Sequence, residues 1–148
     1  MMEFEDRQRG LVRLIYASRS ADSPVSREVA TAIVAKSIQN NRVSDITGLL
    51  VIGGDRFLQV LEGPAGEVER TFARVSQDPR HTDVTVVAKG AGDKRLFRDW
   101  NMAHRQLGPD DAGALNAVGL DAFTPENLDA ERALKLLKTL GQAHLKSV

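Results

Sequence analysis

The sequence predicts an α+β domain with a ferredoxin-like βαββαβ sandwich, extended by an extra strand and by C-terminal helices. Three observations support this fold class. Apolar segments of strand length alternate with segments of helical period in the required order. A Gly-Gly-Asp turn at 53–55 joins two of the strands as a hairpin. A length of 148 residues suits one domain that buries its own core.

The first half of the chain provides a strand, a helix and a hairpin. Residues 11–17 are mostly apolar and predict a buried strand. Ser26 is a favourable N-cap for a helix whose apolar residues recur at helical spacing to about Gln39. Residues 46–52 and 56–62 predict two strands that pair across the tight turn.

A second helix and two more strands follow. Residues 65–77 carry apolar side chains on one helical face, and Pro79 stops this helix. Residues 83–89 predict a fourth strand and roughly 97–104 a fifth, with a loose glycine-containing connection at 90–93. The sheet should therefore be rich in antiparallel pairs and carry both helices on one face.

The C-terminal tail is predicted to be helical. Residues 109–118 indicate a short helix ended by Gly119, and Thr124-Pro125 offers an N-cap and a first helical position for a longer helix. The longer helix carries an apolar stripe of Ala130, Ala133, Leu134, Leu137 and Leu140. This stripe can cover the second face of the sheet or form a dimer surface.

The chain divides into an N-terminal extension (1–10), a core domain (11–104) and a helical extension (105–148). Residues 1–10 are charged and lack the apolar segment of a signal peptide. Twenty basic and 20 acidic residues leave no excess charge for nucleic acid or an anionic membrane. No apolar run is long enough to cross a bilayer, and there is no cysteine. We expect a cytoplasmic protein without a metal site.

Polar side chains beside apolar strands suggest a bound ligand. Tyr16 lies on the first strand. Gln59 alternates with Phe57 and Leu61, so it should face the helices, and a buried glutamine without partners costs about 1–3 kcal/mol. Asn40-Asn41 follows the first helix, where such a pair commonly forms a C-cap or turn. Carboxamides donate and accept hydrogen bonds without charge, which suits a planar heterocycle edged with C=O and N–H groups.

Five spaced motifs occur between Leu11 and Met102. They are Leu14-Ile15-Tyr16-Ala17-Ser18, Asn40-Asn41 with Ile46-Thr47-Gly48-Leu49-Leu50, Phe57-Leu58-Gln59-Val60-Leu61-Glu62-Gly63, Asp78-Pro79-Arg80-His81, and Arg95-Leu96-Phe97-Arg98-Asp99-Trp100-Asn101-Met102. By this combination the chain resembles BLUF domains, which are blue-light sensors that use FAD. The resemblance implies the same ferredoxin-like fold and a noncovalently bound FAD.

The resemblance also implies roles for matching residues. Asn41 matches the asparagine that binds the pyrimidine edge of the flavin, and Asn40 matches a neighbouring position that also faces it. Gln59 matches the switching glutamine between the flavin and Tyr16, the tyrosine essential to the photocycle. The apolar pair that sandwiches the ring is matched by Ile33 and Val75, and a serine near the network by Ser18. The two residues that compete for a place beside the glutamine are matched by Trp100 and Met102.

Basic residues near these motifs are candidates for the FAD phosphates. Arg80, Lys94 and Arg95 are the three that can neutralise them, and His81 is a further cofactor-binding candidate.

The mechanism implied by the resemblance begins with blue light, which makes bound FAD an oxidant. Tyr16 then donates an electron and a proton through Gln59, which is left rotated or tautomerised with a stronger hydrogen bond to a flavin carbonyl. Absorption shifts to the red, and the state decays thermally. We expect no enzymatic turnover. The signal should leave through the last strand and C-terminal helices, towards a second copy of the chain or an unidentified protein partner.

Two other function classes stay open at this point. A flavin-free ferredoxin-like regulatory or binding module would share the fold and core, and a colourless purified protein would favour it. A small hydrolase resembling acylphosphatase needs a glycine-rich phosphate loop. Residues 18–21 contain Arg19 but no such loop, which disfavours the hydrolase.

Overall fold

The computed structural model describes residues 10–21, 25–92, 94–97 and 102–147. Five strands form one sheet in the order β4-β1-β3-β2-β5. They are β1 (Leu11–Ser20), β2 (Thr47–Gly53), β3 (Arg56–Pro64), β4 (His81–Ala91) and β5 (Ala103–Gln106). All neighbours pair antiparallel except β5, which runs parallel to β2. The ferredoxin-like prediction with one added strand is confirmed.

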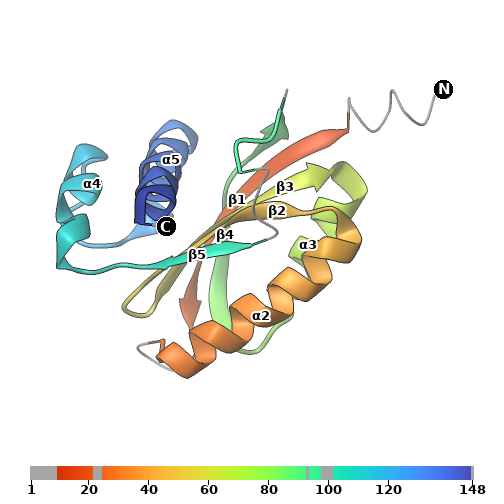
Figure 1. Cartoon of the computed structure of the whole chain (residues 1–148), viewed down its shortest axis with the longest axis horizontal. Helices are drawn as coiled ribbons and strands as arrows, with labels where there is room; N and C mark the ends of the chain where they lie inside the picture. Colours follow the sequence, from red (N-terminus) through yellow and green to blue (C-terminus); the bar gives the residue numbers. More distant parts are fainter. Residues whose placement is uncertain (1–9, 22–24, 93, 98–101, 148) are drawn as a thin grey trace.

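Helices cover both faces of this sheet (Figure 1). Helices α2 (Arg27–Ser44) and α3 (Ala65–Ser76) lie on one face. The opposite face carries the C-terminal elements η1 (Pro109–Asp111), α4 (Ala112–Ala117), η2 (Pro125–Asn127) and α5 (Ala130–Ser147). None of the helices in the described part of the chain is long and apolar enough to span a bilayer.

The alternation along β3 separates two apolar cores. Phe57 and Leu61 pack with α2 and α3, as the sequence predicted. Leu58 and Val60 point the other way and pack with the C-terminal helices. Successive side chains of a strand point to opposite faces, so one strand serves both cores.

Helix α2 is longer than predicted. Its start is confirmed, because the Ser26 side chain accepts a hydrogen bond from the backbone N–H of Val29 at 3.1 Å. The expected end near Gln39 was wrong, since the helix continues to Ser44. Asp45 then adopts a left-handed backbone with φ 58° and donates its N–H to a carbonyl of the last turn. Asn40-Asn41 therefore lies within the helix and not in a turn after it.

The fifth strand ends two residues later than predicted, at Gln106. Residues 98–101 of the expected 97–104 lie outside the described residues. The strand that the structure describes is β5, which pairs Ala103 with Leu49 and Gln106 with Ile52.

The last helix also begins later than predicted. The Thr124 side chain makes no capping bond, and only a short 3-10 turn follows it. Leu128 is extended, and α5 starts anew when Asp129 accepts the backbone N–H of Arg132 at 2.8 Å. Ala130 is consequently exposed at the helix start. The side chains buried against the sheet are Ala133, Leu136, Leu137 and Leu140, so Leu136 was missing from the expected stripe.

Candidate functional site

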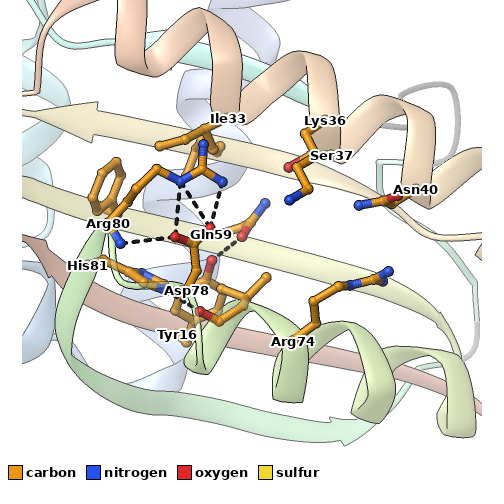
Figure 2. Close-up of a pocket in the computed structure, with 13 residues that line it drawn as sticks. Tyr16, Ile33, Lys36, Ser37, Asn40, Gln59, Arg74, Asp78, Arg80 and His81 are labelled. Carbon is orange, nitrogen blue, oxygen red and sulfur yellow. Dashed lines mark hydrogen bonds and ion pairs between the residues drawn. The ribbon is translucent and has the colours of Figure 1, made fainter.

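An open pocket lies between α2 and α3, above the central strands β1 and β3 (Figure 2). Its space is about 610 Å³ when counted out to the solvent at its mouth.

Helix α2 forms one wall. Ile33, Lys36, Ser37 and Asn40 line the pocket and follow the i, i+3, i+4, i+7 spacing of one helical face. Asn41 is one position further around the helix. It is 2% exposed and is not among the residues that line the pocket. The structure thus brings Asn40, but not Asn41, to the pocket wall.

The end of α3 and the turn into β4 form the other wall. Arg74 and Val75 come from α3, and Asp78, Arg80 and His81 follow it. The two apolar residues predicted to sandwich a ring, Ile33 and Val75, thus lie on different helices that flank one pocket. Because they do not neighbour each other in sequence, only the packing of both helices on the sheet brings them to one cavity.

The floor holds a buried chain of hydrogen bonds. Strand pairing places Tyr16 directly opposite Gln59. The Tyr16 hydroxyl donates to Gln59 Oε1, and Gln59 Nε2 donates to Met102 Sδ at 3.1 Å. All three residues are no more than 4% exposed. The structure therefore places Met102 beside Gln59, whereas Trp100 lies outside the described residues.

The Tyr16 hydroxyl is held in its neutral form. Burial raises its pKa, and the negative charge of Asp78 raises it further. Tyr16 consequently keeps its proton at ordinary pH and acts as the donor toward Gln59. The ring also packs against Phe72, with ring centroids 5.5 Å apart.

His81 and Ser18 form a second set of hydrogen bonds next to Tyr16. His81 Nε2 faces the carbonyl oxygen of Val75, which can only accept, so Nε2 carries the proton. In the neutral ring, Nδ1 then accepts from the Ser18 hydroxyl at 2.9 Å. The ring lies edge-on to Tyr16, with centroids 6.2 Å apart. Ser18 is buried below the pocket, while His81 lines it.

Positive side chains gather at the pocket. Arg80 Nε donates to both carboxylate oxygens of Asp78 at 3.0 Å, and these hydrogen bonds lower the pKa of Asp78. Lys36 and Arg74 are exposed at the same pocket. Of the basic residues proposed from sequence, only Arg80 lines it. Arg95 pairs instead with Asp45 at 3.0 Å, away from the pocket.

Sequence reasoning missed six pocket residues: Lys36, Ser37, Leu50, Phe57, Arg74 and Asp78. A signal for the first two was present, since they follow Ile33 by three and four residues on a helix. The signal for Arg74 and Asp78 was weaker, because both flank the end of a helix whose position on the sheet only the fold sets.

The lining fits a flavin. Apolar side chains of Ile33, Val75, Leu50 and Phe57 suit a planar ring, Gln59 and Asn40 suit its polar edge, and cations suit phosphate. The family model of BLUF, "Sensors of blue-light using FAD", matches residues 11–103. The chain belongs to the BLUF family. It is therefore a blue-light sensor that binds a flavin.

Known BLUF proteins resemble the chain over different extents. The photoactivated adenylate cyclase subunit beta of Euglena gracilis is 38% identical over 93 residues, which are 62% of this chain but 11% of that protein. The chain thus spans about a tenth of the length of that relative. The solved structure titled "BlsA photo-activated state" has a TM-score of 0.78 at 25% identity, covering 88% of this chain and 94% of BlsA. For the dark-state structure of BlrB, a BLUF protein, the TM-score is 0.74 at 28% identity, with coverage of 92% and 98%.

Proposed function

We propose that the flavin of this BLUF protein is FAD, held noncovalently, and that light acts on the hydrogen bonds joining Tyr16, Gln59 and Met102. The observation that carries the proposal is this buried chain on the floor of the pocket. When bound, FAD would supply absorption of blue light and an oxidising excited state. Everything else is done by side chains of the protein.

Each wall has a separate task in this proposal. Ile33 and Val75 hold the ring between α2 and α3, and Asn40 binds its polar edge. Asn41 keeps the same role as a prediction from the family resemblance. Lys36, Arg74 and Arg80 provide positive charge for the phosphates at the pocket.

The Gln59 carboxamide can take two arrangements that both keep a hydrogen bond to Tyr16. In the arrangement described, Oε1 accepts from Tyr16 and Nε2 donates to the Met102 sulfur. A sulfur atom is a weak acceptor and a thioether cannot donate. Rotating the carboxamide therefore forfeits the weak bond to Met102 and reverses the bond to Tyr16: the Tyr16 oxygen can then accept from Nε2, while its O–H has to turn to another acceptor. An exchange of one Tyr16 bond for another suits a switch that light sets and heat resets.

Tyr16 is the electron and proton donor in this proposal. Its raised pKa keeps the hydroxyl protonated in the dark, so the proton leaves only together with an electron. Gln59, which accepts from this hydroxyl, is the first group along its path. Rotation or tautomerisation of Gln59 then stores the signal.

We further propose that the chain turns over no substrate and signals through β5 and the C-terminal helices. The receiver would be a separate protein, or a second copy of this chain, in the cytoplasm.

The first experiment compares visible absorption in the dark and just after blue illumination. A flavin spectrum that shifts slightly to the red and relaxes in the dark is expected. Extracted flavin should be FAD by chromatography, and flavin-free protein should prefer FAD to FMN or riboflavin. Protein that stays colourless after addition of FAD would contradict the proposal and favour a plain binding module.

A variant tests the donor. Tyr16→Phe should retain the flavin and lose the red shift, because the hydroxyl is gone while the ring stays. Ser37→Ala is a matched control that removes another pocket hydroxyl, and its red shift should persist. A normal photocycle in Tyr16→Phe would refute the role of the tyrosine.

A further inference from the structure

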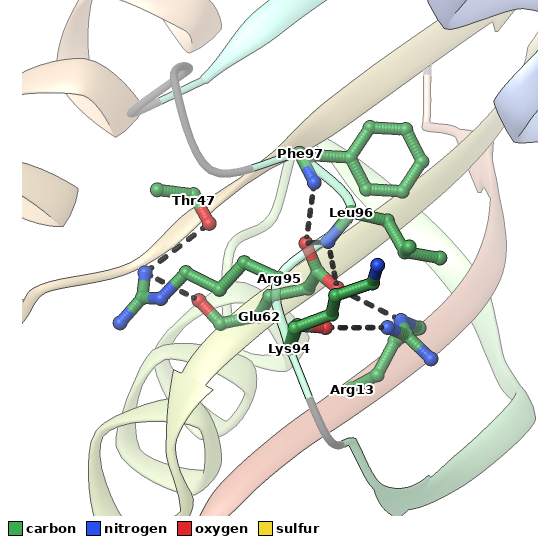
Figure 3. A network of polar contacts seen from close by, with 7 residues as sticks. All are labelled: Arg13, Thr47, Glu62, Lys94, Arg95, Leu96 and Phe97. Atoms are coloured by element: carbon green, nitrogen blue, oxygen red, sulfur yellow. Dashed lines mark hydrogen bonds and ion pairs between the residues drawn. The ribbon is translucent and has the colours of Figure 1, made fainter. Parts of the chain in front are cut away.

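A buried carboxylate holds the chain segment that leads toward Met102 (Figure 3). Glu62 of β3 is 1% exposed. It accepts the backbone N–H of Leu96 at 2.9 and 3.0 Å and that of Phe97 at 2.8 Å. Arg13 Nε donates to it at 2.8 Å. Since each of these partners is a donor, the carboxyl group acts only as an acceptor, as an ionised carboxylate does.

Two arginines hold the same segment from its sides. Arg13 also donates to the backbone carbonyl of Lys94 at 3.1 Å. Arg95 donates to the Thr47 hydroxyl of β2 at 3.2 Å and pairs with Asp45 at 3.0 Å. Residues 94–97 are thus attached to β1, β2 and β3 together. We call Glu62, Arg13 and the segment 94–97 the connector clamp.

Glu62 of the connector clamp and the switching glutamine, Gln59, lie on the same strand. Gln59 and Glu62 are three residues apart on β3, so their side chains point to opposite faces of the sheet. Gln59 contacts Met102, and Glu62 holds the backbone only a few residues upstream of Met102 in the sequence. Directly after Met102, Ala103 begins β5 and pairs with β2.

We propose that Glu62 is a positioning residue that directs movement of Met102 into β5. The proposal rests on the proposed function, because it takes rearrangement of Gln59 as the cause of that movement. Once Gln59 no longer donates to its sulfur, Met102 is free to shift. The connector clamp holds residues 94–97 on the sheet, and β5 follows Met102 directly, so the displacement passes into β5. Without the clamp, residues 94–97 would be free to move as well.

The downstream end of β5 has its own attachment to the helices. Asp111, 6% exposed, accepts from Arg105 Nη2 at 2.7 Å and from the backbone N–H of Gly108 at 2.9 Å. A displacement of β5 therefore reaches η1 and α4 through a partly buried ion pair. Asp111 also supplies a matched control. Like Glu62, it is a buried carboxylate that accepts from an arginine and from a backbone N–H, but it follows β5 in the chain.

The test measures amide hydrogen exchange in the holoprotein with Glu62→Gln. A carboxamide nitrogen cannot accept, so Phe97 loses its partner if the nitrogen takes the place of Oε1, and Arg13 loses its partner if it takes the place of Oε2. In either case Leu96 and Phe97 lose a charged acceptor, so their exchange in the dark should accelerate, by about 10- to 100-fold where the charge-assisted hydrogen bond itself is lost. Unchanged exchange at both amides would overturn the clamp itself, whatever the protein does in light.

The same samples are then compared in light. Wild type should show a red shift and a change in exchange across 103–106. Glu62→Gln should keep the red shift and lose the change in β5, whereas Asp111→Asn should keep both. A β5 response in Glu62→Gln equal to that of wild type overturns the proposal, and so does its loss in both variants. A wild type without a red shift instead overturns the proposed function.

A milder variant covers the case in which Glu62→Gln does not fold. Arg13 is 19% exposed, and Arg13→Gln removes its contacts to Glu62 and to Lys94 while leaving the carboxylate in place. This variant should show the same loss of the β5 response to a smaller extent. A full β5 response in a folded Arg13→Gln protein with faster exchange at Leu96 would also overturn the proposal.

Discussion

Shortening Leu137 to alanine tests whether α5 is part of the core of this domain. Leu137 is 0% exposed and belongs to the core between α5 and the sheet. Replacing a buried leucine by alanine costs about 2–5 kcal/mol, because apolar burial is lost and a cavity remains. In a domain of this size each kcal/mol lowers the unfolding midpoint by about 2–4 °C. Leu137→Ala should therefore unfold roughly 4–20 °C below wild type.

Thermal unfolding followed by circular dichroism gives this shift, and size-exclusion chromatography reports the oligomeric state of the same samples. Leu134→Ala is the matched control, because it makes the same change on the same helix at a half-buried position. Its midpoint should fall by less than half as much. If Leu137→Ala unfolds with wild type but changes the oligomeric state, the stripe is a subunit interface and the reasoning is wrong.

Three further predictions concern titration and backbone contact. Tyr16 is the only tyrosine of the chain, and its raised pKa means that no tyrosinate absorption should appear at about pH 10 while the protein is folded. Since the folded state holds this proton more tightly, its stabilisation is complete below about pH 10 and falls as pH rises, and Tyr16→Phe should weaken that fall in alkaline denaturation. Hydrogen bonds from Arg80 lower the pKa of Asp78 in the folded state, so the ionised Asp78 stabilises the fold above about pH 4 and this contribution is lost as pH falls. Asp78→Asn should therefore reduce the acid dependence of the urea midpoint. A Cβ on Gly48 would lie 1.9 Å from a backbone oxygen of β3, so Gly48→Ala should unfold at lower temperature, whereas Gly113→Ala, with nothing within 4 Å, should not.

The sequence was sufficient for features that depend on neighbours along the chain. Strand alternation predicted that Gln59 shares a face with Phe57 and Leu61, because side chains of a strand alternate strictly. The N-cap at Ser26 was also predictable, since a serine side chain bonds to a backbone N–H only three residues away. Tyr16 was identified by its family motif, and strand pairing places it opposite Gln59.

Helix ends were less predictable for a physical reason. Helix α2 continues past Gln39 and ends at Ser44, where the next residue, Asp45, takes up the left-handed conformation. An aspartate adopts this conformation less readily than glycine does, so the residue type alone is a weak signal for a helix end. The start of α5 likewise depends on Leu128 being extended, which no local pattern specified.

What the sequence by itself determined was the fold class, the faces of the strands and the tyrosine and glutamine of the switch. The tertiary structure decided which helix residues meet at the pocket, placing Lys36 and Arg74 there and Arg95 elsewhere. It also placed Met102 on Gln59 and gave the buried Glu62 its partners on residues 96 and 97. These contacts join residues more than 30 positions apart, and their geometry exists only once the sheet order brings the strands together.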